Sequence, residues 1–183
     1  MSLHAEDAEL LLLYRQPESR EKAFTGIVKK YQERLYWHIR RMVVSHDDTD
    51  DVLQNVFIKV WNGLDNFRED SRLYTWLYRI ATNECLSFLE QQKRKSVVSL
   101  DSMGEALQDK LRSDTHFDAS KLEWKLQLAI QQLPEKQRLV FNLRYYDEMP
   151  YEEMSRVLDT SEGALKASYH HAAKKIEEYI LNR

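Results

Sequence analysis

The sequence predicts an all-α protein made of two small helical domains joined by a flexible linker. The chain has 183 residues but only 4 glycines and 3 prolines, which are too few for the many turns of a β-sandwich or a β-barrel. Apolar residues recur every three or four positions through most of the chain, as amphipathic helices require. Residues 96–121 lack this period and are acidic, so we expect domains at residues 1–95 and 122–183 with a linker between them.

We expect four helical segments in the first domain, with breaks at polar clusters. The expected segments are residues 6–15, 17–44, 48–64 and 72–95. Pro17 suits the first turn of the second segment. Asp47 or Asp48 can cap the third segment, and Asp70 or Ser71 can cap the fourth. Four helices in this length make a compact helical unit.

The third and fourth segments each have an apolar face for burial. In the third, that face is expected to consist of Leu53, Val56, Phe57 and Val60. In the fourth, it is expected to consist of Leu73, Leu77, Ile80, Ala81, Glu84 and Phe88. Glu84 is the one charged residue in either face.

The second domain ends in a predicted helix-turn-helix. Its helical period resumes at Leu122, and Pro134 and Pro150 each begin a further helix. The last two helices are expected at residues 151–158 and 162–181, with a three-residue turn between them. A pair of this kind presents its second helix to the DNA major groove.

The final helix has one apolar face and one small, polar or basic face. The apolar face consists of Leu165, Tyr169, Ala172, Ile176 and Tyr179. The opposite face includes Gly163, Lys166, Ala167, His170, His171 and Lys174. The absence of acids there suits a helix that lies against phosphates and base edges. Residues 151–183 hold six acids and five bases, so an ordinary amphipathic surface helix explains the pattern equally well.

Ile58 lies off the buried face of the third segment. Helical spacing places it beside Asp51, Gln54 and Asn55. An exposed apolar residue among polar ones indicates a surface for a protein partner, although a lone surface isoleucine is the simpler explanation.

The break at residues 65–74 combines aromatic and basic side chains. Trp61, Phe67, Tyr74 and Trp76 border it, and Arg68 and Arg72 lie among them. Such a loop can stack unpaired bases and hold their backbone. The alternative is that the tryptophans fill the domain core, which we expect of Trp76.

The long fourth segment has polar residues that point away from its buried face. Arg79 and Asn83 are one helical turn apart. An outward asparagine has poor helix propensity. It can recognise a base edge through its amide, or it can be a tolerated surface residue.

Composition and motifs exclude several other classes of protein. The single cysteine, Cys85, excludes an intramolecular disulfide framework and a multi-cysteine zinc site. No apolar run approaches the roughly 20 residues that span a bilayer, and acids near the N-terminus do not suit a signal peptide. We find no Gly-rich phosphate loop, no HExxH and no Gly-x-Ser-x-Gly. We therefore expect a cytoplasmic protein with no enzymatic activity, no membrane insertion, no metal and no cofactor.

Four strings in the chain resemble the bacterial sigma-70 family, specifically its extracytoplasmic-function (ECF) group. They occur at residues 50–57, 75–83, 133–141 and from residue 151 onward, and three of them are specific strings in the family's order and spacing. In that family they are the segment that binds the clamp helices of core RNA polymerase, the -10 segment, the start of the C-terminal domain, and the -35 helix-turn-helix. The resemblance covers the chain from about Phe24 to Ile180.

The resemblance implies three sets of contact residues. Core polymerase, through its beta-prime clamp helices, would contact Asp51, Gln54, Asn55 and Ile58. The -10 element would contact Asn66, Phe67, Arg68, Arg72, Tyr74, Arg79 and Asn83. The -35 element would contact Lys166, Ala167, Ser168, His170, His171 and Lys174.

The resemblance also implies a function and a set of partners. The protein would act as a transcription initiation factor that binds core polymerase and promoter DNA and promotes promoter melting. An anti-sigma factor is expected as a further partner, and the free chain is expected to be a monomer. The recognition helix departs from the usual Gly-Thr-Val-Lys-Ser-Arg, because residues 163–168 are Gly-Ala-Leu-Lys-Ala-Ser.

Two competing functions fit parts of the sequence. A stand-alone helix-turn-helix regulator would dimerise and bind a palindrome without polymerase, but it leaves the loop aromatics and the Ile58 surface without a role. A decoy protein would bind polymerase and fail to open DNA.

Overall fold

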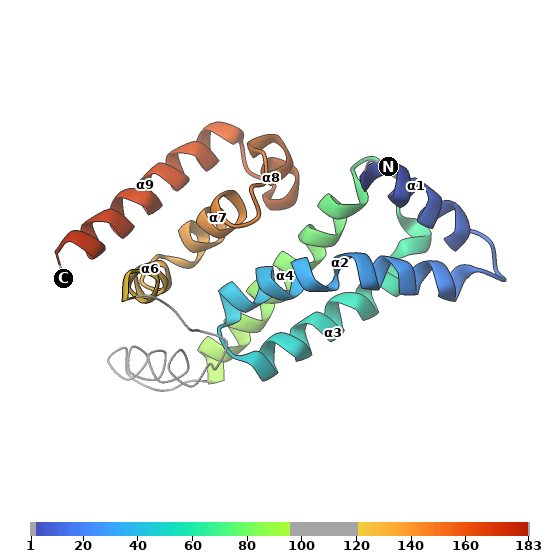
Figure 1. The fold of residues 1–183 in the computed structure, drawn as a ribbon, viewed down its shortest axis with the longest axis horizontal. Helices are drawn as coiled ribbons and strands as arrows, with labels where there is room; N and C mark the ends of the chain where they lie inside the picture. Colours follow the sequence, from blue (N-terminus) through green and yellow to red (C-terminus); the bar gives the residue numbers. More distant parts are fainter. Residues whose placement is uncertain (1–2, 96–120, 183) are drawn as a thin grey trace. The chain divides into compact units, whose positions relative to one another are not determined.

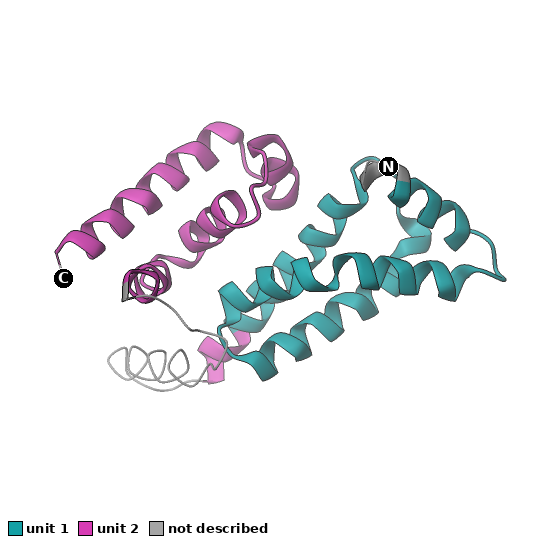
Figure 2. Ribbon diagram, viewed as in Figure 1, with its two compact units in different colours: residues 1–90 teal, residues 91–183 magenta. Residues whose placement is uncertain are grey.

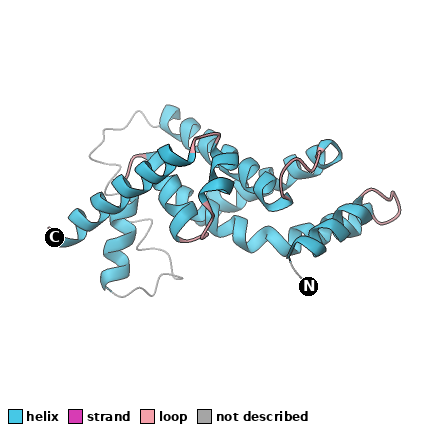
Figure 3. Cartoon of the chain, turned by 90° about the horizontal axis from the view of Figure 1, so that it is seen from above, coloured by secondary structure: helices cyan, strands magenta, loops and turns pink. Residues whose placement is uncertain are grey.

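A computed structural model describes residues 3–95 and 121–182, and the described residues form helices joined by short loops, with no strand among them (Figure 3). The chain divides into two compact units, residues 1–90 and residues 91–183 (Figure 2). The predicted all-α class with two domains is therefore confirmed. The proposed linker, apart from Lys121 at its end, lies outside the described residues.

The first unit is built around one long central helix. Its elements are α1 (Leu3–Tyr14), α2 (Arg20–Val43), α3 (His46–Gly63), a 3₁₀ turn (Leu64–Asn66) and α4 (Leu73–Lys95). Helix α2 packs against α1 and α3, and Figure 1 shows α2 and α3 side by side. Ile27, Leu35 and Ile39 on α2 are fully buried, so this helix supplies the middle of the core.

The second helix begins three residues later than predicted. Pro17 lies in the turn between α1 and α2 rather than in a first helical turn. The Ser19 hydroxyl donates a hydrogen bond to the Leu13 carbonyl at 2.7 Å, and the Ser19 amide donates to the Gln16 carbonyl. These bonds satisfy the end of α1 and hold the turn closed, so α2 starts at Arg20.

The expected cap of α3 was wrong, and α4 begins one residue later than expected. Ser45 caps α3, because its Oγ accepts from the Asp48 amide at 3.4 Å; Asp47 and Asp48 lie in the first turn, where acids suit the helix dipole. Helix α4 starts at Leu73, and the Arg72 carbonyl accepts its first helical hydrogen bond.

The buried faces of α3 and α4 are rotated slightly from the expected ones. On α3 the buried apolar residues are Val52, Val56 and Val60, while Leu53 and Phe57 are half-buried. On α4 the buried residues are Leu73, Thr75, Leu77, Tyr78, Ala81, Thr82 and Cys85. The expected Ile80, Glu84 and Phe88 are half-buried. Glu84 forms an ion pair with Lys59 of α3, which accounts for a carboxylate at the core edge.

The second unit contains four described helices and confirms the predicted helix-turn-helix. They are α6 (Lys121–Gln131), α7 (Glu135–Tyr145), α8 (Tyr151–Leu158) and α9 (Glu162–Leu181). Asp159 ends α8 in the left-handed region, and the Ser161 hydroxyl accepts from the Ala164 amide at the start of α9. The helices enclose a core that includes Ala129, Ile130, Leu133, Phe141, Ala172 and Ile176.

Membrane insertion was not expected, and none of the helices in residues 3–95 and 121–182 combines the length and the apolar character that a membrane crossing requires.

Candidate nucleic-acid and protein interfaces

One face of α3 presents the residues predicted to meet a protein partner. Asp51, Gln54, Asn55 and Ile58 are all exposed. Their spacing by three, four and seven places them on one side of the helix. Ile58 keeps 52% of its surface exposed, whereas Val52, Val56 and Val60 fill the opposite side. The face therefore combines an apolar centre with amide and carboxylate groups, a composition suited to a protein contact.

The loop between α3 and α4 is built on a pair of aromatic rings. We call residues 64–72 the aromatic loop. The half-buried Phe67 ring lies 5.1 Å from the Trp76 ring of α4. Gly63 makes room for this pair, since a Cβ at that position would lie 3.2 Å from Trp76 Cζ2. Asn66 and Arg68 are exposed on either side of Phe67.

A second line of side chains extends along α4. The Tyr74 ring meets the Tyr78 ring edge-on at 6.1 Å, and Tyr78 lies 5.0 Å from the buried His38 of α2. His38 Nε2 is in turn 3.0 Å from Thr82 Oγ1. This line fixes the rotation of α4 against α2.

The rotation of α4 leaves its predicted polar residues at the surface. Arg79 and Asn83 are exposed, and Arg72 is exposed just before the helix. Guanidinium and amide donors therefore lie at the end of the aromatic loop and along α4, which is the chemistry that phosphate and base edges require.

Trp61 does not join the aromatics of this loop. Its ring lies 4.9 Å from Phe24 and meets Tyr14 edge-on at 6.0 Å. The expected group of four aromatics is therefore divided. Phe67 and Trp76 form one pair, Tyr74 continues along α4, and Trp61 packs toward α1 and α2.

Sequence reasoning missed two arginines that reach the aromatic loop. Arg15 forms an ion pair with Glu69, and Arg20 forms one with Asp65. The partners are 54 and 45 residues apart in the chain. No local pattern marks such pairs, and the turn before α2 was not expected to lie near the loop.

The exposed face of α9 holds the residues predicted to approach the -35 element. Lys166, Ala167, His170, His171 and Lys174 are exposed, while Ser168 is half-buried. Lys166 Nζ lies 3.7 Å from Glu162 Oε2 and 5.6 Å from the centre of the Tyr151 ring. On the opposite side, Leu165, Ala172 and Ile176 are buried. The predicted division of α9 into two faces is confirmed.

Two of these α9 residues border a shallow hollow. His171 and Lys174 line it with Gln137, Lys175 and Glu178, and its volume is about 410 Å³. Lys175 Nζ donates to Gln137 Oε1 at 3.0 Å, which connects α9 to the first turn of α7. The hollow therefore lies between the exposed face of α9 and the first turn of α7, with Glu178 beside its basic residues.

Two features of the described residues concern metal binding and thiol chemistry. Within residues 3–95 and 121–182 no group of three or more His, Cys, Asp or Glu side chains could hold a metal ion. Cys85 is buried, and burial, followed by the nearby Glu84 carboxylate, raises the pKa of its thiol. A protonated, enclosed thiol is a poor nucleophile.

Comparison with protein families identifies both units. Sigma-70 region 2 matches residues 27–95, and Sigma-70, region 4 matches residues 123–176. The first match contains the α3 face, the aromatic loop and α4, and the second contains the helix-turn-helix. The chain belongs to the sigma-70 family.

Curated relatives place the chain within the ECF group of that family. The ECF RNA polymerase sigma-E factor of Escherichia coli (strain K12) is 32% identical over 178 residues, which cover 93% of this chain and 93% of that protein. The factor of the same name from Haemophilus influenzae is 30% identical over 177 residues, covering 92% and 93%. This chain is accordingly an ECF sigma factor, a transcription initiation factor that recognises promoters together with RNA polymerase.

Solved structures share the fold. The sigma factor RpoE from Bartonella quintana, crystallised with the anti-sigma factor NepR, has a TM-score of 0.68 and 20% identity, and the match covers 87% of this chain and 97% of that one. CnrH in complex with the cytosolic domain of CnrY has a TM-score of 0.68 and 21% identity, covering 94% and 95%. At these identities the likeness concerns the fold alone.

Proposed function

We propose that this sigma factor binds polymerase and the two promoter elements through three separate surfaces. The α3 face binds core polymerase, the aromatic loop with α4 captures the -10 element, and α9 contacts the -35 element. The observation that supports this division is the exposure of these residues. All of them are exposed except Phe67, Tyr74 and Ser168, which are half-buried.

The proposed domain assignment follows from these surfaces. Residues 1–95 bind polymerase and the -10 element, residues 122–183 bind the -35 element, and residues 96–121 connect them. The core-binding residues are Asp51, Gln54, Asn55 and Ile58. Ile58 would be buried at the centre of that contact, with the polar residues around it.

Capture of the -10 element would use stacking and charge together. Phe67 and Tyr74 offer ring faces or edges to an unpaired base, and Arg68, Arg72 and Arg79 attract the backbone. Asn66 and Asn83 offer amides that discriminate base edges. Binding to bases that are unpaired only in the open promoter would shift the equilibrium toward melting. The protein would perform no chemistry of its own.

Contact with the -35 element would use the exposed face of α9. Lys166 and Lys174 would meet phosphates, while His170 and His171 would lie near base edges or phosphates. Ala167 would leave room for close approach. Ser168 would act at the edge of the contact because it is half-buried.

Run-off transcription tests this assignment. Purified core polymerase would be assayed on a promoter library with and without the protein. New discrete transcripts are expected, and they should disappear for the double variant Asp51→Ala/Gln54→Ala, whose two exposed sites leave the fold intact. Thr25→Ala, another exposed substitution in the first unit, is the control and should retain activity. Full activity of the double variant would contradict the assignment of the α3 face.

We further propose that a protein inhibitor controls this factor. The support is that the solved RpoE relative is bound to the anti-sigma factor NepR. The free protein would be a cytoplasmic monomer that exchanges between inhibitor and polymerase. Adding a candidate inhibitor to the run-off assay should abolish the new transcripts, and excess core polymerase should restore them. A dimer in sedimentation analysis would contradict the monomer and favour a stand-alone regulator instead.

A further inference from the structure

We propose that α1 and the turn after it hold the aromatic loop in the shape that captures a -10 base, with Arg15 and Arg20 as the positioning residues. The inference rests on the proposed -10 role of that loop. It concerns residues that precede the region 2 match, which begins at residue 27.

The loop is held from outside at two places. Arg15 pairs with Glu69 near its end, and Arg20 pairs with Asp65 near its start. Phe67 lies between these two acids in the chain. Fixing both sides of a short loop restricts the positions available to the ring at its middle, which is the preorganisation that base capture needs.

Arg20 belongs to a larger cluster. Its Nη2 also donates to the Tyr14 hydroxyl at 2.7 Å, and its guanidinium lies 4.6 Å from the Tyr14 ring centre and 5.3 Å from that of Trp61. The hydrogen bond to Asp65 is the largest cause of a raised pKa at Arg20. The Tyr14 hydroxyl in turn donates to the Trp61 carbonyl at 3.4 Å.

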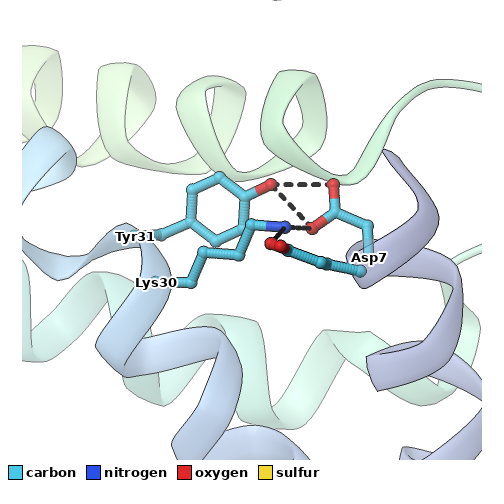
Figure 4. Close-up of polar contacts among 4 residues, drawn as sticks. Asp7, Lys30 and Tyr31 are labelled. Carbon is cyan, nitrogen blue, oxygen red and sulfur yellow. Dashed lines mark hydrogen bonds and ion pairs between the residues drawn. The ribbon is translucent and has the colours of Figure 1, made fainter. Parts of the chain in front are cut away.

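Helix α1 is itself fixed to α2, and this holds the backbone on both sides of the turn that carries the two arginines. The buried Asp7 of α1 accepts hydrogen bonds from the Tyr31 hydroxyl at 2.8 and 2.9 Å and forms an ion pair with Lys30 Nζ at 2.6 Å. Figure 4 shows the tyrosine and the lysine of α2 converging on this one carboxylate. A pairing of this kind resists rotation of α1 against α2.

Charge gives the arginines a second effect. The aromatic loop contains three acids, Asp65, Glu69 and Asp70, although its proposed ligand is a polyanion. Arg15 and Arg20 compensate two of these carboxylates. With Arg68 and Arg72 the loop itself has a net charge of -1, and Arg15 and Arg20 change the local balance to +1, which favours the phosphates of the strand it is proposed to hold.

The backbone indicates that Glu69 needs support. Its φ is 59°, in the left-handed region that residues other than glycine rarely adopt. The ion pair with Arg15 holds the side chain of that residue in one place. Both partners are largely exposed, so the pair contributes little to folding stability, and its effect should be local to the loop.

Charge reversal separates positioning from simple electrostatics. The variants are Arg15→Glu, Glu69→Arg and the double variant Arg15→Glu/Glu69→Arg, each assembled with core polymerase. The probe is a set of fork-junction DNAs, built from the promoter found by run-off transcription, with each of the four bases at every unpaired -10 position. Two quantities are measured. The first is the affinity for each DNA, and the second is the base ratio, which is the affinity for the best base divided by the affinity for the worst base at the same position.

Positioning predicts that both single variants lower the base ratio by about three- to tenfold, the range expected for a coupled pair, and that the double variant restores it to within about twofold. Lys22→Glu is the charge-matched control, because Lys22 is an exposed base in the first turn of α2, and it should leave the ratio unchanged. Thermal unfolding of all four variants should stay close to that of the parent.

Two outcomes would overturn the proposal. In the first, Glu69→Arg strengthens DNA binding and Arg15→Glu weakens it, while the base ratio stays the same in every variant. This is the result expected if the two residues act only through their charge. In the second, the double variant is no better than the single ones. Phe67→Ala distinguishes these failures from failure of the proposed function: if it also leaves the base ratio unchanged, the loop does not capture a -10 base at all.

Discussion

Tyr31 and Asp7 show how single side chains join the N-terminal helix to the first unit. The Tyr31 hydroxyl is buried against the Asp7 carboxylate. Desolvation by burial, and then the hydrogen bond to Asp7, raise the pKa of Tyr31 above its usual range. The folded protein therefore keeps this phenol protonated at pH values where the unfolded chain releases the proton.

The consequence is an alkaline loss of stability that Tyr31→Phe should remove. When folding raises a pKa, the group stabilises the folded protein fully at pH values below its pKa in the unfolded chain, which is about 10 for tyrosine. This contribution to the free energy of unfolding declines as the pH rises beyond that value. The stability difference between the parent and Tyr31→Phe should thus be constant up to about pH 9.5 and then shrink by at most about 1.4 kcal/mol per pH unit. Urea unfolding at several pH values measures it. A stability difference that stays constant through pH 11 would show that folding does not raise the pKa of Tyr31.

Leu165 and Lys166 are neighbours with opposite roles on α9. Leu165 is 1% exposed, and Lys166 is exposed. Leu165→Ala should destabilise the second unit by about 2–5 kcal/mol, because it leaves a cavity in the core. Lys166→Ala should change stability by less than about 0.5 kcal/mol and should weaken contact with -35 DNA. Urea unfolding and promoter binding by the holoenzyme separate the two effects, and the assignment of the faces would be wrong if Lys166→Ala were the more destabilising change.

At the scale of single helices, the cap of α9 determines whether its first turn is ordered. The Ser161 hydroxyl accepts from the Ala164 amide at 3.3 Å. Ser161→Ala should cost about 1 kcal/mol and increase amide exchange in the first turn of α9, whereas Ser161→Asp should retain the cap. This turn contains Gly163 and leads to Lys166, so its fraying would disturb the start of the proposed DNA-binding face. Equal exchange rates in the parent and Ser161→Ala would show that the cap is not needed.

Local elements were the most predictable part of the fold. The helix-turn-helix was predicted to within one residue, because a short turn between two periodic segments is encoded in adjacent residues. The cap of α3 was missed: Asp47 or Asp48 was expected, but Ser45, earlier in the same polar run, accepts the capping hydrogen bond. The start of α2 was missed because Pro17 is equally suited to a turn and to a first helical turn.

The site was predictable where one helix contains all of it. The exposed faces of α3 and α9 follow from helical spacing, and the structure exposes their named residues except Ser168, which is half-buried. The aromatic loop was only half predictable. Its residues were identified, but the separation of Trp61 from Phe67 and the arrival of Arg15 and Arg20 depend on the packing of α1 against α2. Contacts between residues some fifty positions apart leave no periodic signal in the sequence.

At the scale of the whole molecule, the charge balance is unusual for a DNA-binding protein. The chain has a formal net charge of -3, with 27 basic and 30 acidic residues. DNA affinity depends strongly on the number of phosphates that basic residues neutralise. The exposed residues of the proposed -35 surface include only two lysines and two histidines, so we expect the factor alone to have little electrostatic affinity for duplex DNA.

The free protein should therefore bind duplex promoter DNA with a Kd weaker than about 1 µM at physiological salt, in the range of non-specific binding. Together with core polymerase, the same DNA should be bound tightly and in a sequence-dependent way, because polymerase supplies the additional contacts. Fluorescence anisotropy with labelled promoter DNA measures both states, and a promoter with a scrambled -35 element is the matched control. Nanomolar, sequence-dependent binding by the free chain would contradict this dependence on polymerase, since the second unit would then recognise DNA on its own despite the acidic balance of the molecule.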